Sequence, residues 1–256
     1  MSNPIRWPAE AIWEAVVPAL PGFTIEILPQ VDSTNSELMR RARAGQTEPT
    51  LLVAETQTAG RGRLGRAWRG APGECLMCSL ALPLAPRDWS GLSLAVGVSL
   101  AESLHPEIQL KWPNDLWWRG RKLAGILIET AVCGTERHVV IGFGINITPP
   151  HDVDGLNTPP VGLQTLLPGI DAPAALLRVV QPLVQTLQAF EVYGFSPFEA
   201  RFNARDLLRD APVTLSDGQH GTAHGVDESG ALRVLTASGM HSVNSAEVSV
   251  RPAAST

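Results

Sequence analysis

The chain has 256 residues, of which 44% are hydrophobic and 18% charged, and its formal net charge is −5 at pH 7. This composition is typical of a globular protein with a sizeable core, and the acidic balance disfavours nucleic acid as the principal partner. No apolar run is long enough to span a bilayer, and the first residues do not resemble a signal peptide. Three cysteines, an odd number, do not make a disulfide framework, so we expect a cytoplasmic protein without a membrane partner.

Helical and strand patterns alternate along the first 210 residues and predict an α+β fold, a mixed sheet with helices packed against it. We expect helices at residues 9–20, 34–44, 90–104, 174–193 and 196–208. We expect strands at residues 23–28, 51–55, 74–82, 109–112, 115–118, 122–131 and 137–147. Thr34 followed by Glu37 is typical of a capping box, and the Pro- and Gly-rich residues 149–173 predict a long surface loop.

The pattern of apolar, polar and turn residues changes near residue 210. From residue 213 to residue 250, short alternating runs are interrupted by Gly-containing turns at regular spacing. Such a pattern predicts the hairpins of a small β-barrel. We therefore expect a larger domain of residues 1–210 and a small β domain of residues 211–256.

The segment of residues 57–69 (QTAGRGRLGRAWR), here called the Gly-Arg loop, contains four arginines, three glycines and no acidic residue. Glycine lets backbone N–H groups approach an anion closely, and arginine adds forked hydrogen-bond donors. This composition indicates a site for a small anion, although alone it fits a solvated basic loop equally well. We expect its backbone to find few partners, so that the loop is open or disordered without ligand.

Three further motifs carry polar groups in unusual settings. Residues 111–115 (KWPND) present a cation, an amide and a carboxylate from a proline turn, with a plain turn as the alternative. Within an otherwise apolar strand, Gly125 suggests the close approach of a ligand or another backbone, whereas Lys122 alone could extend to solvent. Residues 142–146 (GFGIN) suggest a tight backbone wall, and no dinucleotide-binding Gly-x-Gly-x-x-Gly opens a helix here.

The sequence does not predict a metal held by cysteines. Cys75 and Cys78 are separated by two residues within an apolar strand, so their side chains should face opposite sides of the sheet. No second Cys pair accompanies them. We therefore expect both thiols to lie in the core.

Taken together, the motifs closely resemble the biotin protein ligases in order, spacing and residue identity. The matching segments are residues 60–66 (GRGRLGR), 111–115, 122–127 (KLAGIL) and 142–146, and residues 32–35 (DSTN) resemble the family's opening motif. The resemblance implies a class II synthetase-like catalytic domain followed by an SH3-like barrel. It also implies that biotin and ATP, with Mg²⁺ held mainly by phosphates, give biotinyl-5′-AMP and pyrophosphate. Biotin would then pass to a lysine of a biotin carboxyl carrier protein, such as the acetyl-CoA carboxylase subunit.

The resemblance also assigns site residues, each at a position that matches a family motif. Lys122 would contact the biotin carboxylate and the α-phosphate, and Arg63 would share the catalytic role. Biotin contacts are expected from Ser33, Thr34, Asn35, Gln57, Gly60, Arg61, Lys122 and Gly125. Nucleotide contacts are expected from Arg63, Arg66, Trp68, Lys111, Asn114, Asp115 and Asn146. No residue is assigned as a metal ligand.

Two other functions compete with this interpretation. A lipoate-type ligase uses similar chemistry, but the chain lacks the Arg-Arg-x-x-Gly-Gly-Gly stretch of that family. A biotin-sensing regulator or an Arg-Gly nucleic-acid binder is the non-enzymatic alternative, which the net charge of −5 disfavours. Because the opening motif begins at Val31, we expect a monofunctional ligase without the DNA-binding domain of bifunctional relatives, and hence no specific DNA partner. A monomer or weak homodimer is expected.

Overall fold

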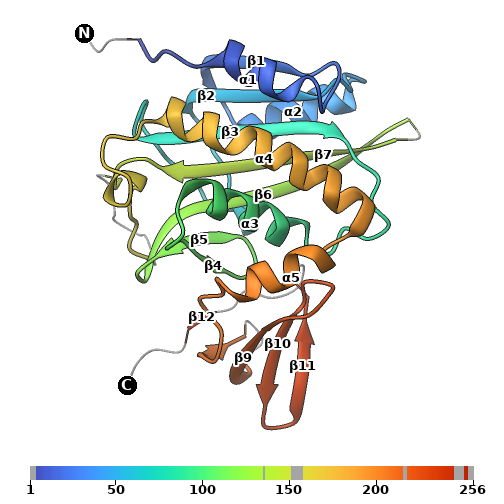
Figure 1. The fold of residues 1–256 in the computed structure, drawn as a ribbon, viewed down its shortest axis with the longest axis vertical. Coiled ribbons are helices and arrows are strands. Elements are labelled where there is room, and N and C mark those ends of the chain that lie inside the picture. Colours follow the sequence, from blue (N-terminus) through green and yellow to red (C-terminus); the bar gives the residue numbers. More distant parts are fainter. Residues whose placement is uncertain (1–3, 135, 151–157, 216–217, 245–250, 253–256) are drawn as a thin grey trace.

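The computed structural model describes residues 4–134, 136–150, 158–215, 218–244 and 251–252. Its centre is a seven-stranded sheet with the strand order β1-β2-β3-β7-β6-β5-β4 (Figure 1). β1 and β2 are parallel, and the other neighbouring strands of this sheet are antiparallel. The strands are β1 (Thr24–Val31), β2 (Thr50–Gln57), β3 (Cys75–Pro83), β4 (Gln109–Lys111), β5 (Asp115–Trp118), β6 (Arg121–Cys133) and β7 (Glu136–Asn146).

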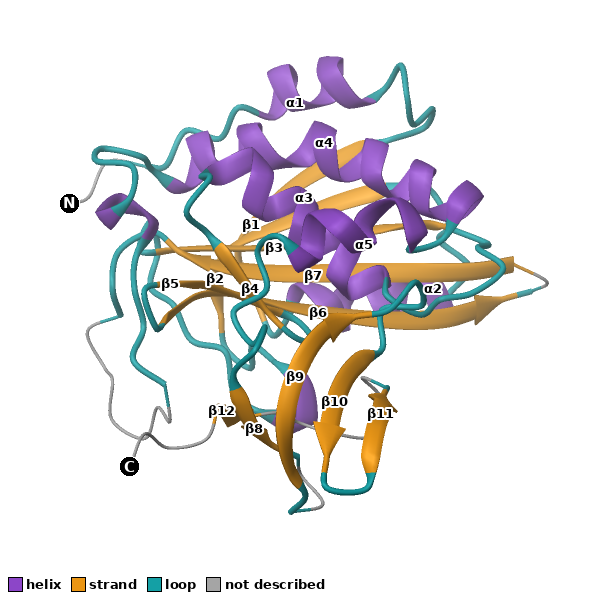
Figure 2. Cartoon of the chain, turned by 60° about the horizontal axis from the view of Figure 1, so that its bottom comes forward, coloured by secondary structure: helices purple, strands orange, loops and turns teal. Residues whose placement is uncertain are grey.

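Helices cover both faces of this sheet. α1 (Ala9–Val16), α3 (Leu92–Leu104) and α4 (Ala172–Tyr193) lie on one face, where they bury the larger hydrophobic core (Figure 2). α2 (Thr34–Arg43) packs on the opposite face against a smaller core that includes Val140 of β7. Because strand residues alternate between faces, the even-numbered residues of β7 from 140 to 146 all face the α2 side.

The composition of α3 and α4 explains their positions. α3 consists almost entirely of small and aliphatic residues around its whole circumference, so it is buried between the sheet and its neighbouring helices. α4 begins after Asp171, whose side chain accepts a hydrogen bond from the Ala174 N–H at 2.8 Å and so caps the helix. Its buried side chains recur at helical spacing, and its outer face is exposed to solvent.

A second sheet of five strands follows, in the order β11-β10-β9-β8-β12. It lies beside α5 (Ser196–Asn203), as Figure 1 shows. Hydrogen bonds join it to the rest of the molecule. The indole Nε1 of the fully buried Trp112 donates to the Gly230 carbonyl at 3.1 Å, and the Asn203 amide exchanges two hydrogen bonds with the Val226 backbone. The strands are β8 (Pro212–Thr214), β9 (His220–Val226), β10 (Leu232–Thr236), β11 (Gly239–Val243) and β12 (Arg251–Pro252).

The predicted elements occur in the expected order, and the α+β class is confirmed. The predicted capping box is wrong, because the N-cap of α2 is Ser33, whose hydroxyl accepts from the Ser36 N–H. Glu37 instead forms ion pairs with Arg40 and Arg41 one helical turn later. The cap falls one residue earlier because Ser33 keeps an extended backbone while Thr34 is already helical.

The expected surface loop at residues 149–173 is partly wrong. Val161, Leu163 and Ile170 are buried, and a short 3₁₀ turn, η2 (Leu163–Thr165), forms within it, so part of this segment completes the larger core. Residues 151–157 lie outside the described residues. The first strand of the second sheet begins at Pro212, while a domain boundary near residue 210 stays a prediction. Among the described helices, none combines the length and apolar character needed to cross a bilayer.

Candidate active site

Two glycines on neighbouring strands form a flat surface, here called the glycine wall, on the α2 side of the sheet. Gly125 of β6 lies directly opposite Gly144 of β7 in the antiparallel register. The indole of Trp68 lies against both: a Cβ at position 144 would collide with the ring, and one at position 125 would come within 3.3 Å of it. The close approach predicted at Gly125, by a ligand or another backbone, is made here by a side chain of the Gly-Arg loop.

Lys122 brings a positive charge to the edge of the glycine wall. Its Nζ lies 2.8 Å from Oδ1 of Asp115, in an ion pair without hydrogen-bond geometry, and 5.7 Å from the centroid of the Trp68 ring. The Lys122 and Asp115 side chains are only 28% and 16% exposed. The two charges meet because Asp115 begins β5 and pairs with Gly125 across the ladder, three residues after Lys122. Lys122 therefore faces the site instead of extending freely into solvent.

Arg63 adds a second cation beside the same carboxylate. It begins a short 3₁₀ turn, η1 (Arg63–Gly65), in the Gly-Arg loop, and its side chain is half-buried. Burial lowers the pKa of its guanidinium, the charge of Asp115 raises it, and the nearby charge of Arg66 lowers it further. The group remains positive at any physiological pH. Two cations around one carboxylate leave this corner with excess positive charge, as an anionic ligand requires.

The N-terminus of α2 lies beside the end of β2 and supplies polar groups. Gln57, the last residue of β2, accepts a hydrogen bond from the Thr34 N–H at 2.7 Å, and the Thr34 hydroxyl lies 3.3 Å from the same oxygen. The Gln57 amide nitrogen faces Gly60 at the start of the Gly-Arg loop, where a Cβ would crowd it. Thr34, Gln57 and Gly60 thus lie together, with Ser33 capping the adjacent helix, while their contacts to biotin stay a prediction.

Asn35 is buried in a polar network below this corner. Its Nδ2 donates to a backbone carbonyl of β6 at 3.1 Å and to Glu129 Oε2 at 2.9 Å. The Ser79 hydroxyl lies 2.6 Å from Asn35 Oδ1 and 2.7 Å from the Thr34 hydroxyl. A Cβ at Gly142 would collide with Asn35 Oδ1, so a glycine is needed there. Asn35 therefore has its amide contacts within the protein, and its biotin contact stays a prediction.

The Gly-Arg loop is folded back on itself. Arg61 and Ala67 form an antiparallel bridge, and the Trp68 N–H donates to the Gly60 carbonyl at 2.8 Å. The Arg61 guanidinium reaches both carboxylate oxygens of Glu129, at 2.8 and 3.1 Å. The expectation that this backbone has few partners is wrong, because the glycines allow a tight hairpin. Whether the loop opens without ligand stays a prediction.

The remaining expected residues lie around this centre. Lys111 Nζ stands 5.4 Å from the centroid of the Trp117 ring. The Asn114 side-chain amide donates to a backbone carbonyl of β6 at 2.8 Å, and that of Asn146 to the Lys122 carbonyl at 3.4 Å. These two amides brace the strands that carry Lys122 and the glycine wall. Arg66 is exposed on the Gly-Arg loop, so its guanidinium lies at the rim of the site.

Sequence reasoning missed Glu129 and Ser79. Each connects several expected site residues: Glu129 contacts Arg61 and Asn35, and Ser79 contacts Thr34 and Asn35. For Ser79 a signal was present, since it is a lone hydroxyl near the middle of an otherwise apolar strand. Buried polar groups in such positions generally have specific hydrogen-bond partners.

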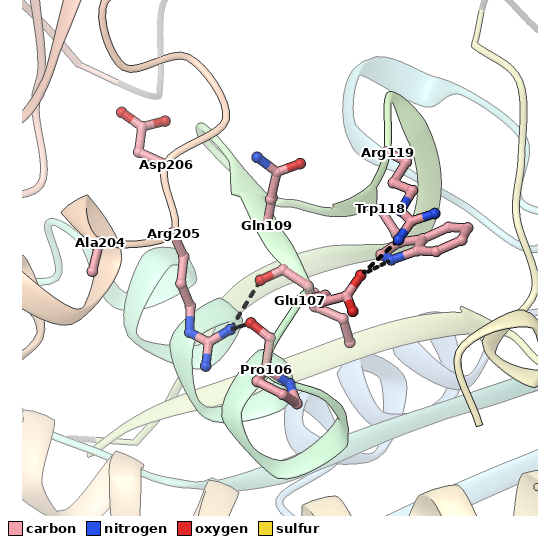
Figure 3. Close-up of a pocket in the computed structure, with 9 residues that line it drawn as sticks. Pro106, Glu107, Gln109, Trp118, Arg119, Ala204, Arg205 and Asp206 are labelled. Atoms are coloured by element: carbon pink, nitrogen blue, oxygen red, sulfur yellow. Dashed lines mark hydrogen bonds and ion pairs between the residues drawn. The ribbon is translucent and has the colours of Figure 1, made fainter.

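A separate hollow of about 360 Å³ lies between β4, β5 and the segment that follows α5 (Figure 3). Glu107 accepts hydrogen bonds there from Trp118 Nε1 at 3.0 Å and from Arg119, while Arg205 donates to the Pro106 carbonyl at 2.7 Å. None of the expected site residues lines this hollow. Glu107 and Arg205 thus pair with neighbouring side chains or with backbone, which indicates a structural junction.

The seven-stranded sheet with its cation-rich corner and the small second sheet together define a two-part protein whose site suits anionic substrates. Residues 27–146 match the Biotin/lipoate A/B protein ligase family, and residues 212–251 match the Biotin protein ligase C terminal domain. The chain belongs to the biotin protein ligase family, and it is an enzyme of the ligase class. The second sheet accordingly corresponds to the SH3-like domain expected from the sequence.

Known relatives cover most of the chain. It is 37% identical over 222 residues to the bifunctional ligase/repressor BirA of Salmonella typhimurium, covering 81% of this chain and 68% of that protein. It is 35% identical over 227 residues to the biotin–[acetyl-CoA-carboxylase] ligase of Mycobacterium tuberculosis, covering 81% of this chain and 82% of that protein. The structure resembles the Aquifex aeolicus biotin protein ligase in complex with biotin and ATP, with a TM-score of 0.76 and 28% sequence identity. The match covers 90% of this chain and 99% of that chain.

Proposed function

We propose that this ligase forms biotinyl-5′-AMP at the glycine wall and then transfers biotin to a lysine of a carrier protein. The observation that carries the proposal is the convergence of Lys122, Arg63 and Trp68 on the wall formed by Gly125 and Gly144. The relatives support it, because the Aquifex protein was solved with biotin and ATP and the Mycobacterium protein is a biotin–[acetyl-CoA-carboxylase] ligase.

In the first step, a biotin carboxylate oxygen attacks the α-phosphorus of ATP, and the bond to the departing pyrophosphate breaks. Two anions must approach each other, so the barrier is largely electrostatic. Lys122 is suited to this step because, among the described residues, Asp115 is the carboxylate that pairs with its ammonium. The anionic substrates can share or replace that partner. Arg63 supplies a second, permanently charged donor on the side of the loop.

The two substrates bind to different parts of the site in this proposal. The polar corner of Ser33, Thr34 and Gln57 faces the biotin ring system, since its hydroxyls and amide can satisfy the ureido N–H and C=O groups. The indole of Trp68 supplies an apolar face beside Lys122. The nucleotide lies toward the β4–β5 turn, with Lys111, Asn114, Asp115 and Asn146 nearby and Arg66 at the rim.

Mg²⁺ is expected to bind mainly to phosphate oxygens. Among the described residues, no three His, Cys, Asp or Glu side chains gather as a metal site, and the Asp115 carboxylate already pairs with Lys122. This donor set fits an ion that keeps most of its waters and is held by one protein carboxylate at most together with substrate phosphates. When bound, the ion would neutralise charge on the triphosphate.

In the second step, the ε-amine of an acceptor lysine attacks the acyl carbonyl of the adenylate, and AMP leaves with its electron pair. The acceptor in this proposal is a biotin carboxyl carrier protein, such as the acetyl-CoA carboxylase subunit named for the Mycobacterium relative. A cytoplasmic location is part of the proposal, and the three free cysteines, two of them buried as predicted, suit a reducing compartment.

Biotin-dependent exchange of label between pyrophosphate and ATP tests the first step directly. The purified chain should catalyse exchange with biotin and Mg²⁺, and lipoate in place of biotin serves as the matched control. Exchange that occurs with biotin but not with lipoate supports the proposal. Exchange only with lipoate would assign the lipoate-type activity, and no exchange with either acid would contradict adenylate formation by this chain.

Two further expectations belong to the same proposal. The protein should be a monomer or a weak homodimer, which sedimentation velocity across a range of concentrations would show. It should not bind a specific DNA duplex, and a gel shift with and without biotin would test this at defined salt. A biotin-dependent shift on one sequence would favour the regulatory alternative.

A further inference from the structure

Glu129 carries the only acidic side chain of β6, on the sheet face that packs against α2. Successive residues of a strand point to opposite faces of the sheet, so Glu129 and Gly125, which are separated by three residues on β6, face the same side. Its carboxylate is 25% exposed and contacts two partners from different parts of the chain. Arg61 Nη2 lies 2.8 and 3.1 Å from its two oxygens, and Asn35 Nδ2 lies 2.9 Å from Oε2. One carboxylate thus connects the Gly-Arg loop, β6 and α2.

The Asn35 side of this connection is rigid. Asn35 is 3% exposed, and its Oδ1 is fixed by the Ser79 hydroxyl at 2.6 Å and by close contact with Gly142. Its Nδ2 also donates to the Leu127 carbonyl of the same strand as Glu129. Glu129 is therefore held on a buried frame in which little can move without breaking several hydrogen bonds.

The Arg61 side of the connection leads into the site. The Arg61 Nε lies 3.1 Å from the Ser36 hydroxyl, so the guanidinium is held between α2 and β6. Arg61 bridges Ala67 across the loop hairpin, and the next residue, Trp68, donates its N–H to Gly60. If Arg61 moved, the hairpin would therefore move with it, and so would the Trp68 indole that lies on the glycine wall.

We propose that Glu129 is a positioning residue for the activation step: it holds Arg61 and thereby fixes the Gly-Arg loop, with Arg63 and Trp68, over the site. This inference rests on the proposed function for its meaning in catalysis. Glu129 acts through Arg61 and does not touch the substrate. A charge-assisted contact to both oxygens, shielded on one side by the sheet, is stronger than an ordinary surface ion pair.

The decisive variant is Glu129→Gln, because the amide oxygen can still accept from Asn35 while the charge that holds Arg61 is lost. Glu37→Gln is the matched control, since it removes ion pairs to Arg40 and Arg41 on the same helix without contacting the loop. Mass spectrometry should follow trypsin cleavage after Arg63 and Arg66, the two arginines that follow Arg61 in the Gly-Arg loop. Such cleavage tracks the population of the open loop.

We expect cleavage at these two arginines to become about three- to tenfold faster in Glu129→Gln and to stay unchanged in Glu37→Gln. In pyrophosphate exchange, the biotin KM should rise by a similar factor with a smaller change in kcat. In an Arg61→Gln background, Glu129→Gln should add nothing further, because the two groups act as one unit.

Unchanged cleavage in Glu129→Gln, or an equal increase in Glu37→Gln, would overturn the positioning role. An additive effect in the Arg61→Gln background would overturn the route through Arg61. The cleavage assay needs no activity, so its result separates this inference from the proposed reaction. If the wild-type chain shows no exchange while Glu129→Gln still loosens the loop, the proposed function fails and the structural role of Glu129 stands.

Discussion

Lys122 and Asp115 form an ion pair at the edge of the glycine wall, and this pair sets how the site is held before substrate binds. The 2.8 Å contact keeps the lysine pointed at the wall, in a setting where each side chain is less than one-third exposed. When Lys122 turns to an anionic substrate, the Asp115 carboxylate keeps the nearby charge of Arg63, so no buried charge is left alone. The arrangement thus suits a group that must meet a carboxylate and a phosphate together.

Replacing Lys122 by alanine should reduce biotin-dependent pyrophosphate exchange about a hundredfold or more, because a preorganised positive group at the reacting centre is lost. The variant should remain folded, which circular dichroism would show. Arg119→Gln is the matched control, since it also removes one positive charge, from a residue stacked on Trp118 outside the site. Exchange at the wild-type rate in folded Lys122→Ala would remove this lysine from the mechanism.

Asp206 should make the protein less stable at neutral pH than at mildly acidic pH. Burial raises the pKa of its carboxyl from 3.8 to about 6, and Oδ2 is buried without a hydrogen-bond partner among the described residues. Since the folded state then binds the proton more tightly, stability falls as pH rises from about 4 through about 6. Asp206 lines the hollow of Figure 3, where Oδ1 accepts from the Leu208 N–H at 2.9 Å.

Asp206→Asn keeps an oxygen for the Leu208 N–H and removes the titrating group. The variant should gain about 1–3 kcal/mol over the wild type at pH 7.5, and the gain should shrink toward pH 4. Urea unfolding at several pH values measures the difference. A gain that is the same at every pH would show that the effect does not come from this carboxyl.

At the scale of elements, the glycine wall shows why two adjacent strands both have glycine at the positions that pair across the ladder. Gly125 and Gly144 are cross-strand partners, and the Trp68 ring needs the space above both. The contacts differ in severity, because a Cβ at position 144 overlaps the indole whereas one at 125 lies 3.3 Å from it. The pair therefore provides a graded test within a single structural feature.

Gly144→Ala should displace Trp68 and weaken biotin binding about tenfold or more, whereas Gly125→Ala should weaken it by a few-fold at most, because a few tenths of an ångström of ring movement relieve the contact. Isothermal titration calorimetry with biotin measures both affinities. Near-UV circular dichroism would report the tryptophan displacement. Equal affinities for the two variants would show that the indole does not depend on the wall for its position.

The order of elements was predictable from the sequence because apolar periodicity and turn residues are local signals. Lone exceptions in apolar strands, Lys122 and Gly125, also pointed to the site. Local patterns could not show that Val161 and Ile170 fill the core from a Pro- and Gly-rich segment, because most of the core that they join comes from residues far away in the sequence. The role of Glu129 was hidden for the same reason, since its partner Arg61 is 68 residues away.

At the scale of the whole molecule, the small sheet and the active site share one support. Trp112, from the same turn as Lys111 and Asp115, is fully buried and donates to Gly230 in the turn that joins β9 to β10 of the small sheet. The chain running on from α5 adds a backbone bridge between Leu110 and Asp206. The β4–β5 turn is thus held both by the turn that joins β9 to β10 and by the segment after α5, which links the position of the small sheet to the geometry of the candidate site.

The chain contains few lysines, and this limits how far the enzyme can be acylated by the adenylate that it forms. Of its 20 Lys and Arg residues, only Lys111 and Lys122 are lysine, and both belong to site motifs. Lys122 pairs with Asp115, and Lys111 stands over the Trp117 ring. An acyl-adenylate acylates free amines, whereas an arginine side chain stays protonated and is a poor nucleophile. An adenylate that escapes the site therefore meets almost no reactive amine on the enzyme.

The wild-type chain should consequently label itself only weakly when incubated with biotin, ATP and Mg²⁺ without carrier. Arg69→Lys places an exposed amine at the end of the Gly-Arg loop and should raise self-biotinylation several-fold, because the adenylate is most concentrated beside the site. Arg119→Lys, at an exposed position outside the site, is the matched control and should show a smaller increase. Streptavidin blotting with peptide mapping measures the labelled position. If Arg69→Lys gains no label over the wild type while exchange activity is intact, lysine scarcity does not protect this enzyme.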